Sequence, residues 1–374
     1  MVRSKGVYAA IGVVASAVLA LSACSSSGTA SSSSAASSAA STAAEASSAA
    51  PATGSSASAA ASALDVDWGA YCGPDCQAAL TLKANASDVS CKVAMLVPAT
   101  SFPYGAAQFQ QAQDNAKKYF PNMELTVLNA DGDAATQSNQ LDTVVSQGIK
   151  TIILDPLVRD ALVPSTKKAV DSGANVIVVD RTVNTPVLTT IKAPDVPLGE
   201  RAGQFIADYL KGKGKVAILS GSAGASPTID RTQGFMNVMK KYPGIEIVAD
   251  VAGDYDTAKA EQATTNLLSR FPKGQLDLIY THADNMAFGA IPAIKAAGRG
   301  DDVKLVGIDG QEQSMDAISA GDYLATVAYP VVQPMAIVAA AKACMGESMP
   351  SEIALDYPLI TADNVAEYKG TAGF

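Results

Sequence analysis

The sequence has little of what most hydrolytic and metal chemistry depends on. It has one histidine, His282, in 374 residues. A serine-histidine-aspartate triad would have to use that single imidazole, and no Gly-x-Ser-x-Gly motif is present to hold a nucleophilic serine. A metal site is disfavoured too, because the cysteines have only this distant histidine to complete a ligand set. We therefore expect neither a metal cofactor nor a triad hydrolase.

Clustered positive charge and long apolar runs are also scarce. The formal net charge is -9, and no predicted helix carries a cluster of Lys and Arg, which argues against nucleic acid as a partner. Residues 7–21 form the longest apolar run, which has the length of a signal-peptide core and is short for a membrane span. No other stretch approaches membrane-spanning length.

The N-terminus has the pattern of an export signal. Arg3 and Lys5 precede the apolar run, which ends in Leu21-Ser22-Ala23-Cys24, a sequence that resembles a bacterial lipobox. We predict that residues 1–23 are removed and that Cys24 becomes the lipidated first residue. An uncleaved anchor helix is the alternative, and small residues followed by a serine run suit it less well. Either way, the body of the protein lies outside the cytoplasm.

Residues 24–64 are almost entirely Ser, Ala, Thr and Gly and contain no aromatic residue. Such a composition cannot bury enough apolar surface to offset the entropy lost on ordering. We predict a disordered tether, which as a flexible coil of about 40 residues spans roughly 35 Å. The tether would hold the folded body near a membrane.

Four cysteines remain after Cys24, an even number that favours disulfides in an exported chain. Four cysteines allow three connectivities. We predict that Cys72 pairs with Cys76, closing a small loop, and that Cys91 pairs with Cys344.

Short, continuous apolar runs alternate with helical patterns from residue 93 onward, which fits strands buried on both faces of a parallel sheet. The predicted strands cover residues 93–97, 125–128, 151–154, 176–179, 216–219, 245–248, 278–280, 304–308 and 324–328. Helices are predicted near residues 105–119, 135–147, 160–172, 199–211, 228–241, 257–271 and 285–297. A body of about 310 residues suits two cores. The predicted fold class is α/β, with two doubly wound parallel-sheet lobes and a ligand cleft between them.

Several predicted strands end in polar residues that would face this cleft. Asp180-Arg181 follows one strand, and Asp309 and Tyr329 follow two others. Carboxylates accept hydrogen bonds from neighbouring hydroxyls, and guanidinium offers a fork of donors. These residues together suit a sugar ligand, although a single Asp at a strand end is as often a helix cap and Asp180-Arg181 is also consistent with a structural ion pair.

The order of motifs from Val93 to about Thr361 resembles the ribose-binding branch of the type I periplasmic-binding-protein family. The matching stretches are Phe102-Pro103-Tyr104, Val178-Val179-Asp180-Arg181, Arg231-Thr232-Gln233-Gly234-Phe235, Asp254-Tyr255-Asp256, Asp284-Asn285-Met286-Ala287-Phe288-Gly289-Ala290 and Val306-Gly307-Ile308-Asp309-Gly310. The resemblance implies aromatic contacts to a sugar from Tyr104 and Tyr255. It implies polar contacts from Asp180, Arg181, Arg231 and Asp309.

The chain departs from the family pattern in the predicted pocket lining. The departures are Phe102 for a small polar residue, Gly105 for a second aromatic, Ala283 for an asparagine and Tyr329 for a frequent glutamine. We therefore expect a monosaccharide or polyol other than ribose to be a plausible ligand. Two neighbouring residues are weaker candidates: His282 as a ligand contact, and Asp284 as the cap of a helix that begins at Asn285.

The resemblance also implies a domain division. Lobe 1 would comprise residues 91–192 and 330–346, and lobe 2 residues 193–329 and 347–374. Three hinge crossovers are implied, near Lys192 to Asp195, at Tyr329-Pro330 and after Gly346. Residues 65–90, which include Trp68, have no counterpart in the family and are interpreted as a disulfide-stapled cap or an importer contact.

The leading hypothesis is a lipid-anchored, monomeric binding protein that delivers its ligand to the permease of an ABC importer and catalyses no reaction. A ligand-presenting sensor subunit is an alternative, whereas a repressor is excluded because a signal and tether replace its DNA-binding segment. An exported glycan hydrolase would use Asp180 and Asp309 as its carboxylate pair. Nearby arginines should instead keep both carboxylates ionised, which favours binding.

Overall fold

The computed structural model describes residues 64–371 and 373–374. The predicted signal peptide, the predicted lipidation site at Cys24 and nearly all of the predicted tether lie outside the described residues. No helix in the described part of the chain is long and apolar enough to cross a membrane.

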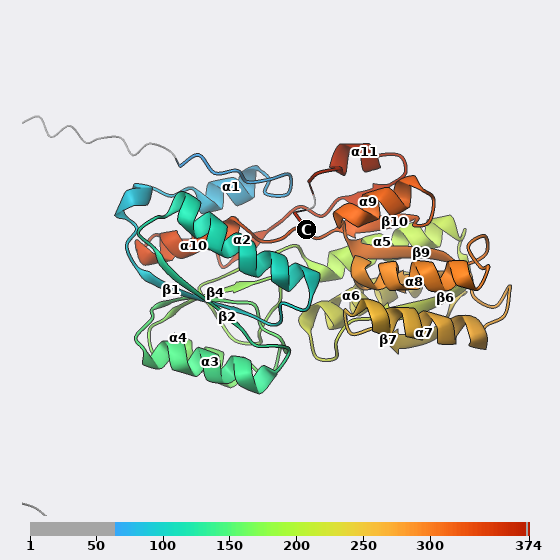
Figure 1. The fold of residues 1–374 in the computed structure, drawn as a ribbon, viewed down its shortest axis with the longest axis horizontal. Helices are drawn as coiled ribbons and strands as arrows, with labels where there is room; N and C mark the ends of the chain where they lie inside the picture. Colours follow the sequence, from blue (N-terminus) through green and yellow to red (C-terminus); the bar gives the residue numbers. More distant parts are fainter. Residues whose placement is uncertain (1–63, 372) are drawn as a thin grey trace, which may run out of the picture. The chain divides into compact units, whose positions relative to one another are not determined.

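The first lobe is built on a six-stranded sheet in which every pairing is parallel. Its strands, in spatial order, are β11 (Glu352–Ala354), β5 (Thr189–Lys192), β4 (Asn175–Val179), β3 (Thr151–Leu154), β1 (Lys92–Val97) and β2 (Glu124–Asn129). Its helices are α2 (Pro103–Tyr119), α3 (Ala134–Ser146), α4 (Val163–Asp171) and α10 (Met335–Cys344). Figure 1 shows α3 and α4 on one face of the sheet and α2 and α10 on the other.

The second lobe repeats this architecture. Its strands, in spatial order, are β12 (Leu359–Thr361), β10 (Ala325–Ala328), β9 (Lys304–Asp309), β8 (Leu278–Thr281), β6 (Lys213–Ser220) and β7 (Gly244–Ala252). The pairing of β12 with β10 is antiparallel and the other pairings are parallel. Its helices are α5 (Asp195–Tyr209), α6 (Ser226–Met239), α7 (Thr257–Arg270), α8 (Asp284–Ala296), α9 (Glu312–Ser319) and α11 (Val365–Tyr368). The predicted fold class is confirmed.

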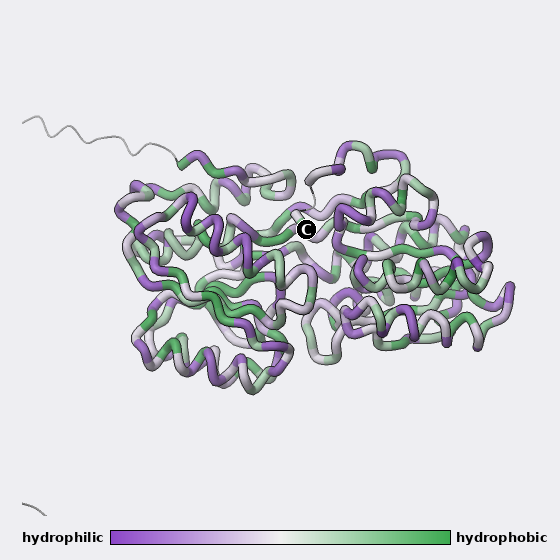
Figure 2. Tube along the Cα trace, in the orientation of Figure 1, coloured by the Kyte–Doolittle hydropathy of each residue, from purple (hydrophilic) through white to green (hydrophobic). Residues whose placement is uncertain are grey.

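The central strands are apolar along most of their length because each sheet has helices on both faces. In β1, Val93 and Met95 join a core cluster with α2 and α10, whereas Ala94 and Leu96 join a cluster with α3 and α4. Figure 2 shows the resulting concentration of hydrophobic residues along the strands of this sheet. The parallel arrangement brings the carboxyl ends of the strands to one edge of each sheet, where polar side chains gather.

The chain crosses between the lobes three times. The crossing segments are residues 193–194 between β5 and α5, 329–334 between β10 and α10, and 355–358 between β11 and β12. The prediction that all of residues 347–374 belong to the second lobe is wrong for β11. That strand pairs with β5 in the first sheet, where Ile353 lies opposite Ile191 and is buried.

The sequence analysis predicted neither the short strands β5, β11 and β12 nor the helices α9, α10 and α11. The three strands are only three or four residues long and carry polar or charged residues, so they give no continuous apolar run. Helix α10 is buried along almost its whole length and therefore lacks the polar face that marks an amphipathic helix.

Residues 64–90 pack mainly on the first lobe, and Tyr71 also joins the core of the second lobe. Helix α1 (Pro74–Leu80) contacts α10 and β11, and Leu80 is fully buried. The Lys342 ammonium of α10 donates to the Thr81 carbonyl at 2.7 Å. Both predicted disulfides are confirmed: Cys72–Cys76 closes the loop at the start of α1, and Cys91–Cys344 joins the residue before β1 to the end of α10.

Asp284 is a central hydrogen-bond acceptor of the second lobe. Its carboxylate accepts from the backbone N–H groups of Gly310 and Gln311 at 2.8 and 3.0 Å. It also accepts hydroxyl hydrogen bonds from Tyr323 at 2.6 Å, from Thr326 at 2.8 Å and from Ser314. The predicted capping role is wrong: Asp284 is the first residue of α8, the N-cap is Ala283, and the carboxylate points instead to the turn after β9.

The two disulfides should differ in their effect on stability. Replacing both Cys91 and Cys344 by Ser should lower the free energy of unfolding by about 2–4 kcal/mol, since this bond joins residues 253 apart and strongly restricts the unfolded chain. Replacing Cys72 and Cys76, which are 4 residues apart, should cost less. Urea unfolding of both variants measures the difference, and equal losses would argue against an entropic origin.

Removing the Asp284 carboxylate should destabilise the second lobe strongly. Asp284→Ala leaves several buried donors without an acceptor, and we expect a loss of at least about 3 kcal/mol in the free energy of unfolding. Asp316→Ala is the matched control, because this carboxylate is 78% exposed and its loss should change stability by less than about 0.5 kcal/mol. Similar urea midpoints for the two variants would contradict the assigned role of Asp284.

Candidate functional site

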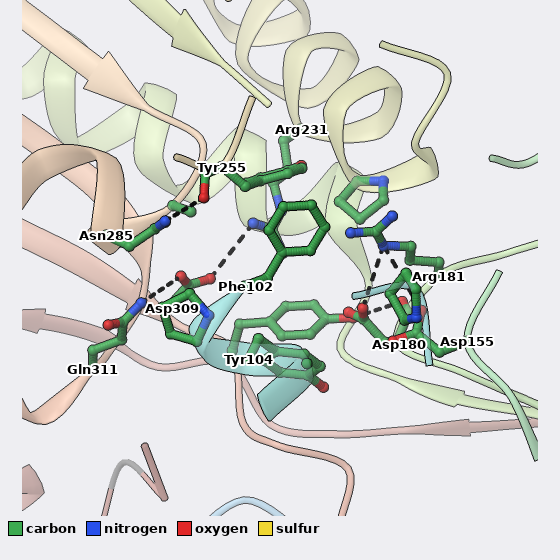
Figure 3. Close-up of a pocket in the computed structure, with 16 residues that line it drawn as sticks. Phe102, Tyr104, Asp155, Asp180, Arg181, Arg231, Tyr255, Asn285, Asp309 and Gln311 are labelled. Carbon is green, nitrogen blue, oxygen red and sulfur yellow. Dashed lines mark hydrogen bonds and ion pairs between the residues drawn. The ribbon is translucent and has the colours of Figure 1, made fainter. Parts of the chain in front are cut away.

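One pocket lies between the lobes, at the carboxyl ends of the strands of both sheets. The space between its atoms amounts to about 510 Å³, part of it open to solvent. Figure 3 shows carboxylates, guanidinium groups and aromatic rings converging on this space. The lining residues are Pro98, Phe102, Pro103, Tyr104, Gly105, Asp155, Asp180, Arg181, Pro227, Arg231, Tyr255, Ala283, Asn285, Asp309, Gln311 and Tyr329.

The structure brings all nine predicted ligand-contact residues to this pocket. The first lobe supplies Phe102, Tyr104, Asp180 and Arg181, the second lobe supplies Arg231, Tyr255, Ala283 and Asp309, and Tyr329 lies on a crossover. Residues more than 200 positions apart in the chain therefore meet in a single cavity.

The polar wall of the first lobe combines two carboxylates with one guanidinium. Arg181 Nε lies 3.6 Å from Asp180 Oδ2 and 3.7 Å from Asp155 Oδ1. Arg181 also donates through NH1 to the Leu157 carbonyl at 2.9 Å, which fixes the guanidinium. Asp180 has a φ of 60°, in the left-handed region that residues other than glycine seldom adopt. This conformation at the end of β4 turns its side chain into the pocket.

The polar wall of the second lobe is organised around Arg231 of α6. Its Nε donates to Asp195 Oδ1 at 2.8 Å, and its NH1 donates to the His282 carbonyl and lies 3.6 Å from Asp309 Oδ1. The guanidinium carbon is 4.8 Å from the ring centre of Tyr329, which is within cation–π range. The guanidinium is thus held by a carboxylate, a carbonyl and a ring while it faces the cavity.

Asp309 is fixed from both sides by neighbours of the same lobe. Its Oδ2 accepts from Gln311 Nε2 at 3.2 Å and from the Asp284 backbone N–H at 3.3 Å. Its φ is 128°, and the Asp284 carboxylate holds the turn that follows. Asp284 is therefore a positioning residue for this wall and not a lining residue.

Aromatic rings from both lobes pair across the pocket. Phe102 and Tyr255 meet edge to face with ring centres 6.4 Å apart, and Tyr104 and Tyr329 do so at 5.6 Å. The Tyr329 hydroxyl donates to the Asp180 carbonyl at 2.7 Å, and that of Tyr104 donates to the Pro330 carbonyl at 3.1 Å. The hydroxyls are engaged with the protein, so the rings are left to offer apolar faces and edges.

Burial governs the charges of this site. Burial raises the pKa of Asp180, and it raises those of Asp155 and Asp309 well above their usual range, although the neighbouring guanidinium groups act to lower them. At Asp180 and Asp309, burial therefore outweighs the expected effect of the nearby arginines on the pKa. At Asp195, burial also favours the neutral form, but Lys192 and Arg231 outweigh it and lower the pKa.

His282 does not line the pocket. It is fully buried, and its Nδ1 accepts from the Gly221 backbone N–H at 3.2 Å. Burial, reinforced by the nearby Arg231 charge, lowers its pKa to about 3. The imidazole is a neutral packing residue.

The sequence reading missed Asp155, Asn285 and Gln311. Asp155 directly follows β3 just as Asp180 directly follows β4, so the same strand-end signal was present. Asn285 donates to the carbonyl of Tyr255, which lies 30 residues earlier in the chain. Gln311 donates to the carboxylate of Asp309, its neighbour two residues earlier. The glycine at position 105 also has a structural reason, since a Cβ there would lie 2.1 Å from the Ala99 carbonyl oxygen.

Comparison with known proteins gives consistent matches. The periplasmic binding protein domain family matches residues 93–347. The chain is 35% identical over 247 residues to a xylitol-binding protein of Mycolicibacterium smegmatis, covering 65% of this chain and 70% of that protein. It is 29% identical over 237 residues to a ribose import binding protein of Bacillus subtilis, covering 63% and 75%.

Solved structures agree with this assignment. A solute-binding protein of an ABC transporter from Mycobacterium smegmatis, with bound glycerol, superposes with a TM-score of 0.71 at 29% identity, covering 76% of this chain and 99% of that one. A galactofuranose-binding protein gives 0.71 at 26% identity, covering 76% and 100%. The chain belongs to the periplasmic binding protein family, whose members are substrate-binding components of transport systems and not enzymes.

Proposed function

We propose that this protein is the extracytoplasmic substrate-binding component of an ABC importer, and that it binds a monosaccharide or polyol in the pocket between its lobes. The observation that carries the proposal is the lining itself. Carboxylates and guanidinium groups from both lobes surround a space flanked by aromatic rings. Hydroxyl groups match the polar groups, and the C–H faces of a sugar or polyol match the rings.

The names of the relatives support this ligand class. Xylitol, ribose and galactofuranose are an open-chain polyol, a pentose and a furanose sugar, and proteins named for each resemble this chain. They share a dense set of hydroxyls without charge. At sequence identities of about 30%, the relatives do not determine which of these compounds is bound. The residues that line the pocket, which here include Phe102, Ala283 and Tyr329, determine it.

Ligand exchange requires the lobes to separate. The four charged residues of the pocket are each less than a tenth exposed: Asp180, Arg181, Arg231 and Asp309. A ligand that contacts them is therefore enclosed between the lobes and cannot enter or leave while they are closed. The three crossovers at residues 193–194, 329–334 and 355–358 are the segments about which the lobes would hinge. The permease would then recognise the closed form.

A thermal-shift screen against pentoses, hexoses, polyols and inositols tests the ligand class. A ligand present at 100 times its dissociation constant should add about 2.7 kcal/mol to the free energy of unfolding. A shift with one or more of these neutral compounds, and none with amino acids or peptides, is the expected result. A panel in which no sugar or polyol shifts the transition contradicts the proposal.

Two substitutions test the pocket assignment. Asp180→Ala and Arg231→Ala should each weaken binding of the compound found in the screen by at least about 2 kcal/mol, roughly 30-fold, since each leaves buried partners unpaired. Asp171→Ala and Arg270→Ala remove the same side chains from exposed positions and should bind as wild type does. Calorimetric titration measures all four, and unchanged affinity in both pocket variants would place the site elsewhere.

We also propose that Cys24 is lipidated and holds the protein at the outer face of the cell membrane, as a monomer. The support is the lipobox-like Leu21-Ser22-Ala23-Cys24 and the Ser/Ala-rich segment that follows it.

Replacing Cys24 by Ser tests the anchor. The wild-type protein should incorporate a radiolabelled fatty acid and sediment with membranes, whereas Cys24→Ser should take up no label and appear in the soluble fraction. Labelling of both variants, or of neither, would contradict the anchor at this residue.

A further inference from the structure

Asp155 lines the pocket, and hydrogen bonds fix its position while one of its carboxylate oxygens remains unpaired. It is fully buried at the carboxyl end of β3. Gln108 Nε2 donates to its Oδ2 at 3.2 Å. The Gln137 side chain fixes the backbone, since it donates to the Asp155 carbonyl and accepts from the Leu157 N–H, both at 2.7 Å. Asp155 Oδ1 is buried and has no hydrogen-bond partner among the described residues.

Arg181 presents the complementary unpaired group on the same wall. Its Nε–H is buried and also has no hydrogen-bond partner among the described residues. Nε lies 3.7 Å from Asp155 Oδ1 and 3.6 Å from Asp180 Oδ2, beyond hydrogen-bond length in both cases. Because NH1 is engaged with the Leu157 carbonyl, the guanidinium is not free to turn toward either carboxylate. An unpaired donor and an unpaired acceptor therefore lie 3.7 Å apart, on two residues that line the pocket (Figure 3).

A single hydroxyl group satisfies both atoms. It donates its hydrogen to one acceptor and accepts a hydrogen bond on its oxygen. An ammonium group only donates, so it leaves Arg181 Nε unpaired and places a second positive charge beside the guanidinium. An ether or carbonyl oxygen only accepts, which leaves Asp155 Oδ1 unpaired when this carboxyl group is ionised, and an unpaired buried polar atom is costly.

We infer that Asp155 and Arg181 form a subsite for one free hydroxyl group of the ligand, and that Asp155 is a specificity-determining residue that selects a hydroxyl over a methylene, ether or amine at that position. The inference rests on the proposed sugar or polyol binding and adds to it the group chemistry at one end of the pocket.

The test compares wild type with Asp155→Ala and Asp155→Asn by calorimetric titration. The probes are xylitol, D-ribose and myo-inositol, together with analogues of each in which one hydroxyl at a time is replaced by hydrogen, methoxy or amine. For a probe that binds, replacing one particular hydroxyl should weaken binding to wild type by about 10–100-fold. The same replacement should cost Asp155→Ala no more than about threefold, because the partner is already gone.

The conservative variant separates acceptor from charge. Asp155→Asn keeps a carbonyl oxygen that can face the pocket, and the Gln108 amide can turn to accept from the new NH₂. Part of the affinity for the intact probe should return in Asp155→Asn relative to Asp155→Ala. Asp171→Ala serves as the control for an exposed carboxylate of the same lobe. Thermal unfolding without probe shows whether each variant is folded, and if Asp155→Ala is not, the comparison of wild type with Asp155→Asn decides.

Three results would overturn the inference. The intact probe could bind Asp155→Ala and Asp155→Asn as tightly as wild type, the loss of the sensitive hydroxyl could cost wild type and variants equally, or the amine analogue could bind more tightly than the parent. Each of these occurs while wild type still binds a probe, so the proposed function survives. If no probe and no member of the screening panel binds wild type, the proposed function fails and the subsite with it.

Discussion

A chain of buried charges links the first crossover to the pocket, and the arrangement of the site depends on it. Lys192, the last residue of β5, pairs with Asp195 at the start of α5, Asp195 pairs with Arg231 of α6, and Arg231 faces Asp309 at the end of β9. Burying such charges is costly unless each is paired and hydrogen-bonded. Asp195 meets that condition with a cation on each side, and Arg231 meets it through Asp195, whereas the pairing of Arg231 with Asp309 is loose, at 3.6 Å. Incomplete pairing at the pocket end is where a ligand can contribute.

The same division runs through the whole site. Several residues behind the cavity use their hydrogen-bonding groups within the protein: Asp284 accepts from five donors, Gln137 holds the backbone at Asp155, and the hydroxyls of Tyr104 and Tyr329 donate to backbone carbonyls. The groups that face the cavity are held in place but are not all satisfied. Such pre-organisation lets a ligand form hydrogen bonds without first paying to order the side chains that receive it.

Most of the strands and most of the polar residues of the pocket could be predicted from the sequence. Each wrong or missing prediction has a physical reason. Continuous apolar runs located most strands, polar residues at strand ends located four residues that line the pocket, and the family resemblance added the other five. Asp155 carried the same signal and was passed over. Asp284 was misread because local sequence suggests a helix cap, whereas its partners lie 26 to 42 residues further along the chain. Strand β11 was misplaced because three residues carry no pattern, and only pairing with β5 shows which sheet they complete.

The charged residues of the pocket also bear on which class of ligand it can bind. Three carboxylates line it, those of Asp155, Asp180 and Asp309, against the two guanidinium groups of Arg181 and Arg231. Each guanidinium group lies within 4 Å of two carboxyl groups, so the anion of a sugar acid or a phosphorylated sugar would have to compete with these carboxyl groups for the same cations. Burial raises the cost of that contact, because the surrounding medium screens it weakly. This arrangement favours an uncharged polyhydroxyl compound over an anion as the ligand.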